Sequence, residues 1–132
     1  MNPETFQQLD KVIHEKGRMA IMSMLAASAE LSFTELRDAL GMTDGNLTTH
    51  IRTLKKSGYV AVAKSVQDNR PLTTCALTAA GRKAFGKYVA LLEGIVKSAK
   101  RFEKKSKRAK TARAAKTKRR KTNDHTNFAL QS

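Results

Sequence analysis

The chain has 132 residues and a formal net charge of +15, with 26 Lys and Arg against 11 Asp and Glu. This length is typical of one compact domain with some residues to spare. The single cysteine excludes an internal disulfide and a multi-cysteine metal site. A charge of this sign and size indicates a polyanionic partner, meaning DNA, RNA or an anionic membrane.

Targeting and catalytic motifs are missing from the sequence. No stretch reaches the roughly 18 apolar residues that span a bilayer, and the N-terminus has no basic region followed by an apolar core, as a secretion signal would. We therefore expect a cytoplasmic protein with no membrane partner. The sequence has no Ser/His/Asp set, phosphate loop or catalytic carboxylate pair, so we expect no enzyme and no bound cofactor or metal.

The first elements are expected to be helical. Residues 5–16 predict a short helix, and residues 18–28 predict a central buried helix because they are apolar nearly all round. A third helix begins at Ser32 or Phe33 and runs through Leu40, where Gly41 suits the left-handed position that ends a helix. The first of these helices has one apolar stripe, formed by Phe6, Leu9, Val12 and Ile13.

A further helix, a hairpin and a last helix follow. Thr43 is a good N-cap for a helix from Asp44 to about Ser57. Two strands, residues 59–66 and 72–77, flank a polar turn and form a hairpin. Thr78 then caps a helix that runs from Ala79 to about Phe102.

Most of the positive charge lies near the C-terminus. Residues 1–97 hold 13 Lys and Arg against 9 Asp and Glu, whereas residues 98–132 hold 13 against 2. Beyond residue 103 almost nothing is apolar, and such a segment buries too little surface to offset its ordering entropy. We therefore predict a folded domain over residues 1–102 and a disordered basic tail over residues 103–132.

The order of elements is that of a mainly α fold with a small β-hairpin, a winged helix-turn-helix. On a helical wheel, Leu47, Ile51 and Leu54 form the buried stripe of the helix that begins at Asp44. The opposite surface is made almost wholly of hydrogen-bonding side chains, as the reading of base edges requires. Asp44 lies only at its N-terminal edge, so the face carries little negative charge.

Each polar side chain on this helix and hairpin has an expected partner on DNA. We expect base contacts from the N-terminal half of the helix, because Asn pairs with adenine and Thr offers a methyl or a hydroxyl. Basic residues further along are expected to contact phosphates, and Arg70 at the hairpin tip is placed to reach a minor groove. The base-reading candidates are Asn46, Thr49, His50 and Thr53. The whole DNA-binding set is Thr43, Gly45, Asn46, Thr49, His50, Arg52, Thr53, Lys55, Lys56, Lys64 and Arg70.

Two blocks, Thr43-Asp44-Gly45-Asn46-Leu47 and Leu77-Thr78-Ala79-Ala80-Gly81, together with residues 18–25, 33–38 and 54–60, resemble a known family. The stretch from Ile13 to Val96 is similar to small prokaryotic winged-helix DNA-binding transcriptional regulators related to the MarR group. The resemblance implies a homodimer on a pseudo-palindromic operator, with the helix from Asp44 as recognition helix and the 67–71 loop as wing. The long basic tail is not part of the usual pattern.

The last helix carries apolar residues at alternating steps of three and four, which is a heptad seam. One interpretation is a helix packed on its own domain, and the other is a helix paired with its mate, so that both terminal helices serve dimerisation. The predicted dimer interface comprises Phe6, Leu9, Ile13, Phe85, Tyr88, Leu92, Ile95 and Phe102.

Three hypotheses remain open. The first is a homodimeric, sequence-specific regulator of double-stranded DNA, acting as a repressor and associated with the nucleoid. The second is a non-sequence-specific nucleic-acid or chromatin protein in which the basic tail dominates. The third is a winged helix that binds another protein. The sequence does not identify the operator or a small-molecule effector, and neither a metal role for His50 nor a redox role for Cys75 is favoured.

Overall fold

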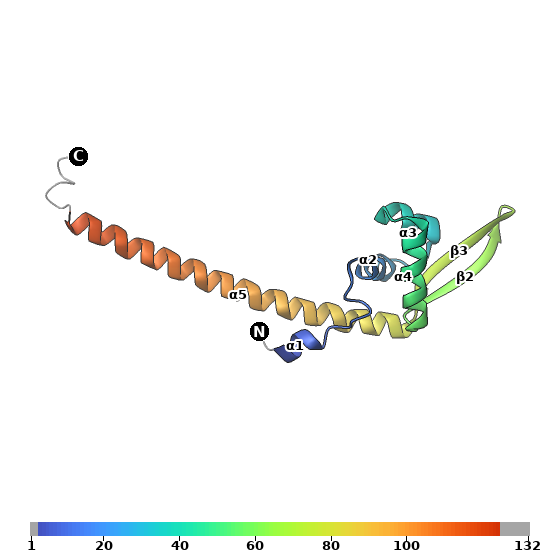
Figure 1. The fold of residues 1–132 in the computed structure, drawn as a ribbon, viewed down its shortest axis with the longest axis horizontal. Coiled ribbons are helices and arrows are strands. Elements are labelled where there is room, and N and C mark those ends of the chain that lie inside the picture. Colours follow the sequence, from blue (N-terminus) through green and yellow to red (C-terminus); the bar gives the residue numbers. More distant parts are fainter. Residues whose placement is uncertain (1–2, 125–132) are drawn as a thin grey trace. The chain divides into compact units, whose positions relative to one another are not determined.

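The computed structural model describes residues 3–124, and the side chains of residues 3–115. Helices α2, α3 and α4 gather at the base of a long hairpin (Figure 1). This is the winged-helix arrangement that the sequence predicts. The elements in chain order are α1 (Pro3–Gln7), α2 (Lys16–Ala26), β1 (Leu31–Ser32), α3 (Phe33–Leu40), α4 (Asp44–Lys56), β2 (Val60–Gln67), β3 (Arg70–Leu77) and α5 (Ala79–Asp124).

The first predicted helix was wrong in its extent, because α1 ends at Gln7 and the chain to Glu15 is not helical. The carboxylate of Asp10 accepts hydrogen bonds from the backbone N–H groups of Val12 and Ile13, at 2.8 and 3.2 Å. This local pairing competes with a helix for the same donors. Glu15 then caps α2 by accepting from the backbone N–H of Arg18, so α2 begins at Lys16.

The predicted C-cap of α3, Gly41, and the predicted N-cap of α4, Thr43, are confirmed, and a capping box at the start of α3 is an addition. Ser32 accepts from the N–H of Glu35, and the Glu35 carboxylate accepts from the N–H of Ser32, which together form a capping box. Gly41 ends α3 in the left-handed region, at φ 61°. The hydroxyl of Thr43 accepts from the N–H of Asn46 at 3.1 Å, which fixes the start of α4. The turn between the two helices is therefore defined at both ends.

The sheet has three antiparallel strands in the order β1-β3-β2. The two long strands form the predicted hairpin, but β3 begins at Arg70, two residues earlier than predicted, because the turn is shorter. The short β1 is an addition, in which Leu31 pairs with Cys75 and Ser32 with Thr74. Two residues give no alternating pattern, so the sequence offered no signal for it. Pairing with β3 fixes the chain just before α3 and ties that helix to the hairpin.

The core beneath the helices and the hairpin is built mainly from aliphatic side chains. The predicted stripe of α4 is confirmed, since Leu47 and Leu54 are fully buried and Ile51 is 7% exposed. They meet the buried face of α2 and the base of the hairpin. The other fully buried or nearly buried apolar residues are Leu9, Ile13, Ile21, Met22, Leu25, Leu36, Val60, Cys75, Leu77 and Tyr88.

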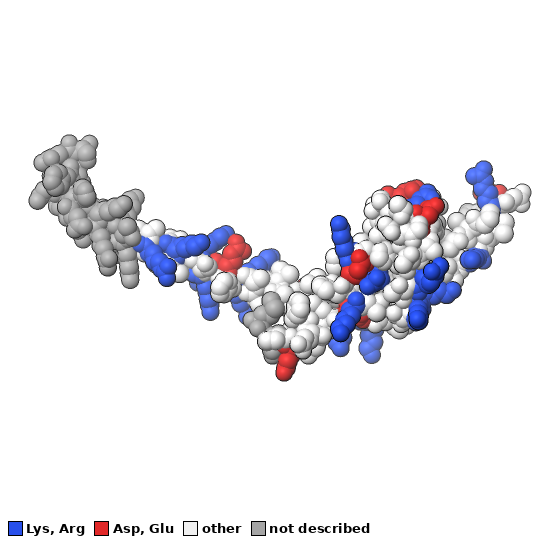
Figure 2. Space-filling model, viewed as in Figure 1, with Lys and Arg blue, Asp and Glu red and all other residues white. Residues whose placement is uncertain are grey.

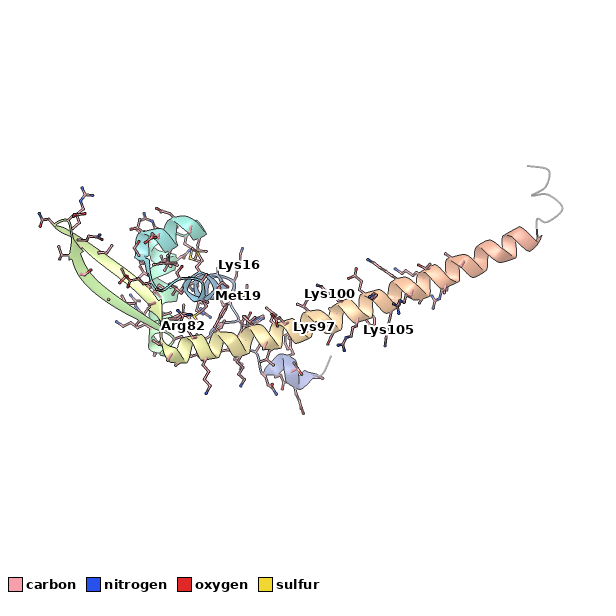
Figure 3. All side chains as sticks on the ribbon, turned by 180° about the vertical axis from the view of Figure 1, so that it is seen from behind. Lys16, Met19, Arg82, Lys97, Lys100 and Lys105 are labelled. Atoms are coloured by element: carbon pink, nitrogen blue, oxygen red, sulfur yellow. The ribbon has the colours of Figure 1, made fainter. Side chains whose placement is uncertain are left out.

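Tyr88 joins the segment before α2 to α5. Its hydroxyl is hydrogen-bonded to Nδ1 of His14 at 2.8 Å and lies 3.3 Å from the sulfur of Met19. Met19 is labelled on α2 in Figure 3. Burial raises the pKa of the Tyr88 phenol. The N-terminal segment is thus held on its own domain by directed hydrogen bonds as well as by apolar contact.

The chain divides into a first part ending at Glu93 and a second part beginning at Gly94, and α5 contributes to both. The helix continues to Asp124, well beyond the end predicted near Phe102. Ala, Lys and Arg favour helices, and neither Gly nor Pro follows Gly94 to interrupt one. The domain boundary predicted after residue 102 stays a prediction. Residues 125–132 of the predicted tail lie outside the described residues.

Candidate nucleic-acid interface

The two faces of α4 differ in character: one is apolar and buried in the core, and the other is polar and points outward. With Leu47, Ile51 and Leu54 buried, the residues between them must point outward. Of the residues predicted to bind DNA, the structure leaves exposed on this helix and its cap Thr43, Gly45, Asn46, Thr49, Arg52, Lys55 and Lys56, with Thr53 half-buried. The predicted side chains, apart from His50, are therefore brought together on one surface.

Three hydroxyls on this helix are hydrogen-bonded back to the preceding turn. Thr49 donates to the carbonyl of Gly45 at 2.9 Å, Thr53 to that of Thr49 at 3.1 Å, and Ser57 to that of Thr53 at 3.0 Å. A hydroxyl that has donated its hydrogen keeps only acceptor lone pairs. Thr49 and Thr53 therefore offer outward an acceptor oxygen and a methyl group, which is a narrower chemistry than the sequence alone implies.

The acid at the edge of this face is paired. Asp44 lies in the first turn of α4, and its Oδ1 is 2.9 Å from Nη1 of Arg37 on α3. The same guanidinium contacts Asp38 at 3.0 Å. Both carboxylates are exposed, so the pairs contribute little to stability. They do offset the negative charge that would otherwise border the polar outer face of α4.

His50 is placed differently from the prediction. Its side chain is 21% exposed and lies against the first turn of α2, with Nδ1 at 3.5 Å from Oε2 of Glu15. A Cβ built on Gly17 would come within 2.7 Å of its Nε2. His50 therefore contacts α2, and we remove it from the base-reading candidates and treat it as a residue that positions α4. The sequence showed Gly17 only as an interruption, and nothing in it linked Gly17 or Glu15 to position 50.

Glu15 is held ionised by its surroundings. Hydrogen bonds from the backbone N–H groups of Gly17 and Arg18 lower the pKa of its carboxyl, while partial burial opposes this and the charges of His50 and Arg18 assist it. The carboxylate thus caps α2 and approaches the helix that carries the polar face.

The hairpin carries two exposed cations. Asp68 and Asn69 form a two-residue turn with φ of 53° and 62°, the left-handed conformation that tight hairpins favour. Arg70 begins β3 directly after the turn and is exposed, as is Lys64 on β2. The structure therefore puts Arg70 at the tip and Lys64 nearer the helices, as predicted.

A hollow of about 420 Å³ separates α4 from the hairpin. Its lining combines basic side chains (Arg52, Lys55 and Lys64) with apolar and hydroxyl groups, and no carboxylate contributes; the other lining residues are Phe33, Thr48, Ile51, Val62 and Thr73. Lys and Arg side chains gather where α4 and the hairpin meet (Figure 2). Two cations of α4 and one of the hairpin thus line the same hollow.

Three of the predicted dimer residues are buried within the protomer. Leu9, Ile13 and Tyr88 are between 0 and 6% exposed in the single chain. The interpretation of the last helix as packed on its own domain therefore holds at Tyr88, and these residues leave the proposed interface. Phe85 is half-buried and stacks on Tyr88, with ring centroids 6.2 Å apart.

Other predicted dimer residues remain accessible. Phe6 is 57% exposed and Phe102 is 75% exposed, and Leu92 is half-buried. Ile95 lies with Phe102 in the second part of the chain. Contact of these residues with a second copy stays a prediction.

Cys75 is 1% exposed on the central strand. Burial raises the pKa of its thiol, which disfavours the reactive thiolate. Among residues 3–124 no three His, Cys, Asp or Glu side chains are grouped so as to hold a metal ion. Over the same residues no helix has the length and apolar character that crossing a membrane requires.

Residues 18–96 match the family of winged helix DNA-binding domains. The chain belongs to this family. The resemblance inferred from the two sequence blocks is confirmed, and the matched residues include α4, the hairpin and the hollow between them. The family and the fold are those of DNA-binding regulators.

Relatives of the chain are consistent with this assignment. An uncharacterized protein of Methanocaldococcus jannaschii is 34% identical over 79 residues, which are 60% of this chain and 86% of that one. A transcriptional regulator homologue from Pyrococcus horikoshii OT3 has a TM-score of 0.69 at 26% identity, over 73% of this chain and 97% of that chain. A structure described as a MarR-family regulator from Enterococcus faecalis V583 shares the fold, with a TM-score of 0.59 at 24% identity, over 82% and 94%.

Proposed function

We propose that this winged-helix protein is a homodimeric, sequence-specific repressor that binds operator DNA. The observation that carries the proposal is the outer face of α4, where Asn46, Thr49 and Thr53 offer hydrogen-bonding groups next to a basic surface with its bordering acid paired. A helix of this kind fits the major groove, and Asn is suited to a bidentate contact with adenine.

The hollow between α4 and the hairpin supports this mode of binding. When a helix enters the major groove and a wing reaches the neighbouring minor groove, one phosphate strand passes between them. Arg52, Lys55 and Lys64 line the hollow, so we assign them to phosphates of that strand. Arg70 at the wing tip then contacts the minor groove or its phosphates.

A dimer would place two such surfaces on one duplex. The heptad steps of α5 continue through Ile95, Ala99 and Phe102, and the exposed ring of Phe102 has no described contact with another ring. Two recognition helices in successive major grooves require half-sites about 10 base pairs apart. Repression follows if the bound dimer occupies DNA that the transcription machinery needs. Sedimentation of the full chain, compared with Phe102→Gln, tests the interface: we expect the variant to dissociate at higher concentration.

Selection of bound duplexes from a random pool tests the function. We expect a pseudo-palindromic consensus. Asn46→Ala should relax the preference at one base position, at a cost of about 1–3 kcal/mol, whereas Arg70→Ala should weaken binding to all sequences alike. Recovery of no consensus would favour the non-specific alternative, for which the net charge of residues 98–132 is the supporting feature. Unchanged DNA binding by an Asn46→Ala, Thr49→Ala variant would favour a protein partner.

A further inference from the structure

Residues 97–108 of α5 carry a dense row of cations. Seven of these twelve residues are Lys or Arg and one is acidic, Glu103. All seven basic side chains are exposed, and the view from behind labels Lys97, Lys100 and Lys105 on the helix (Figure 3). The full set is Lys97, Lys100, Arg101, Lys104, Lys105, Lys107 and Arg108.

These cations lie on one side of the helix. At 100° per residue, all seven fall within an arc of about 160° centred near Lys97 and Arg108. The other five residues of the stretch fall outside the arc: Ser98, Ala99, Phe102, Glu103 and Ser106. We call the arc the basic face of α5. The segregation ends after Arg108, because Lys110 and Arg113 lie on the opposite side at this spacing.

A charge run that serves only solubility has no reason to be one-sided. The side chains on both sides of this stretch are exposed or, at Ser98 and Ser106, half-buried, so cations at any position would be hydrated equally well. The proposed dimer seam of Ile95, Ala99 and Phe102 lies opposite the cations and would keep charges off its own side. The cations on the side that the seam leaves free are then available to a charged partner.

The spacing of charges along the basic face is comparable to that along duplex DNA. Twelve residues at a rise of about 1.5 Å span roughly 17 Å, so the basic face presents one cation per about 2.4 Å of helix axis. Duplex DNA carries one phosphate charge per about 1.7 Å of its axis. One cation is partly occupied, since Nζ of Lys107 lies 3.2 Å from Oε1 of Glu103, but both side chains are largely exposed and the pair is weak.

An anionic membrane is the less suitable partner. An amphipathic helix that lies in a membrane surface inserts several large apolar side chains opposite its charges. Opposite the basic face, residues 98–106 supply one such side chain, Phe102, and the others there are Ala, Ser and Glu. The charges can therefore be neutralised by DNA, while the insertion that a membrane requires is poorly supported.

We propose that the basic face of α5 is a second DNA-binding surface, which contacts the phosphate backbone independently of base sequence. The proposal rests on the proposed DNA-binding function and adds to it. It differs from a diffuse basic tail because it assigns the contact to the seven cations of one helix face and not to the number of charges.

Two pairs of substitutions in the full chain separate these alternatives. Lys104→Gln with Arg108→Gln removes two charges from the centre of the basic face. Lys110→Gln with Arg113→Gln removes two from the opposite side, and Gln preserves helix propensity in both. Affinity for the selected operator is measured by fluorescence anisotropy from 50 to 300 mM salt, with helicity followed by circular dichroism.

We expect the first pair to lower affinity roughly tenfold or more near 0.1 M salt and to reduce the salt slope by up to about 1.8 per protomer bound, and the second pair to change little. Equal losses in both pairs would overturn the face in favour of a diffuse tail. No loss in either, or stronger capture by phosphatidylserine vesicles than by duplex, would overturn DNA as its partner.

The same assay separates this proposal from the function on which it rests. A difference between the pairs that persists on random-sequence duplex, in a protein that selects no consensus, would leave the basic face standing and sequence-specific binding refuted. A clear consensus, with no difference in DNA affinity between the two double variants, would support sequence-specific binding and refute the basic face as a DNA-binding surface.

Discussion

Gly17 and His50 are in contact where α2 meets α4. A Cβ added to Gly17 would lie 2.7 Å from Nε2 of His50 and 2.9 Å from its Cδ2, and 3.3 Å from Oε2 of Glu15. Gly17 is itself buried, so a side chain at this position would require the ring of His50 to move. The helix proposed to read DNA is therefore in contact with a residue outside the helix-turn-helix.

Replacing this glycine tests the contact. Gly17→Ala should displace the ring of His50 and lower the free energy of unfolding by about 1 kcal/mol, the low end of the cost of overpacking a core, because side-chain atoms and not backbone must move; DNA binding should weaken if α4 shifts with the ring. Urea unfolding measures the first effect and anisotropy the second. Gly45→Ala is the matched control, since nothing lies within 4 Å of its added Cβ, and it should leave stability unchanged or slightly raised. Adding His50→Ala to Gly17→Ala should recover part of the loss; full stability of Gly17→Ala alone would contradict the contact.

A second glycine is required where α5 begins. A Cβ on Gly81 would lie 2.1 Å from the backbone carbonyl oxygen of Tyr59, which already accepts the N–H of Thr78 at 3.0 Å. Backbone cannot move aside as a flexible side chain can. Gly81→Ala should therefore destabilise the domain by at least about 2 kcal/mol.

Gly86 provides the comparison on the same helix, because a Cβ there meets nothing within 4 Å. Gly86→Ala should raise stability by about 0.5–1 kcal/mol, through helix propensity alone. The measurement is the midpoint of thermal unfolding, compared between Gly81→Ala and Gly86→Ala. Similar midpoints would show that α5 does not pack against Tyr59 as closely as the structure has it.

The Glu15 cap makes stability depend on pH. Backbone hydrogen bonds from Gly17 and Arg18 lower the folded pKa of this carboxyl below its ordinary value of 4.5. A lowered folded pKa means that the stabilisation is present above the unfolded pKa and is lost as pH falls through the folded one.

Glu15→Gln removes the titration but keeps an acceptor for the cap. The difference in unfolding free energy between the wild type and this variant should be largest near neutral pH and should shrink below about pH 4.5. Glu30→Gln, at an exposed position, controls for the general effect of removing a carboxylate. A difference that grows on acidification would contradict the assignment.

Local signals made much of the fold predictable. Thr43 and Gly41 act through hydrogen bonds and backbone angles within a few residues, so their roles could be inferred from sequence. The capping box of Ser32 and Glu35 is equally local, but it was not predicted. The buried stripe of α4 was equally accessible, because it depends on periodicity alone. The hairpin was found for the same reason, although its turn proved to be only two residues long.

Contacts between distant residues were not predictable in this way. His50 and Gly17 are separated by 33 positions, and the polar face of α4 gave no reason to exclude His50 from it. Tyr88 fitted a heptad seam, yet its hydroxyl contacts His14 and Met19 of the same protomer. A periodic pattern identifies a buried side of a helix without saying which surface covers it.

Thr49 offers a final test, at the level of single atoms. Because its hydroxyl donates to the carbonyl of Gly45 at 2.9 Å, its oxygen is an acceptor toward DNA. Adenine N6 and cytosine N4 present donors in the major groove, whereas guanine presents only acceptors there. We therefore expect the base facing Thr49 in a selected operator to be adenine or cytosine.

Two substitutions separate this acceptor from the Thr49 methyl group. Thr49→Val keeps the shape and removes the oxygen, and it should relax the preference at one position by about 1–3 kcal/mol. Thr49→Ser keeps the oxygen and should preserve the preference, with a smaller loss of affinity. Competition binding with operators changed at that base pair gives the measurement. The reverse order, with Ser losing the preference and Val keeping it, would mean that Thr49 reads a thymine methyl instead and that its hydroxyl serves only α4 itself.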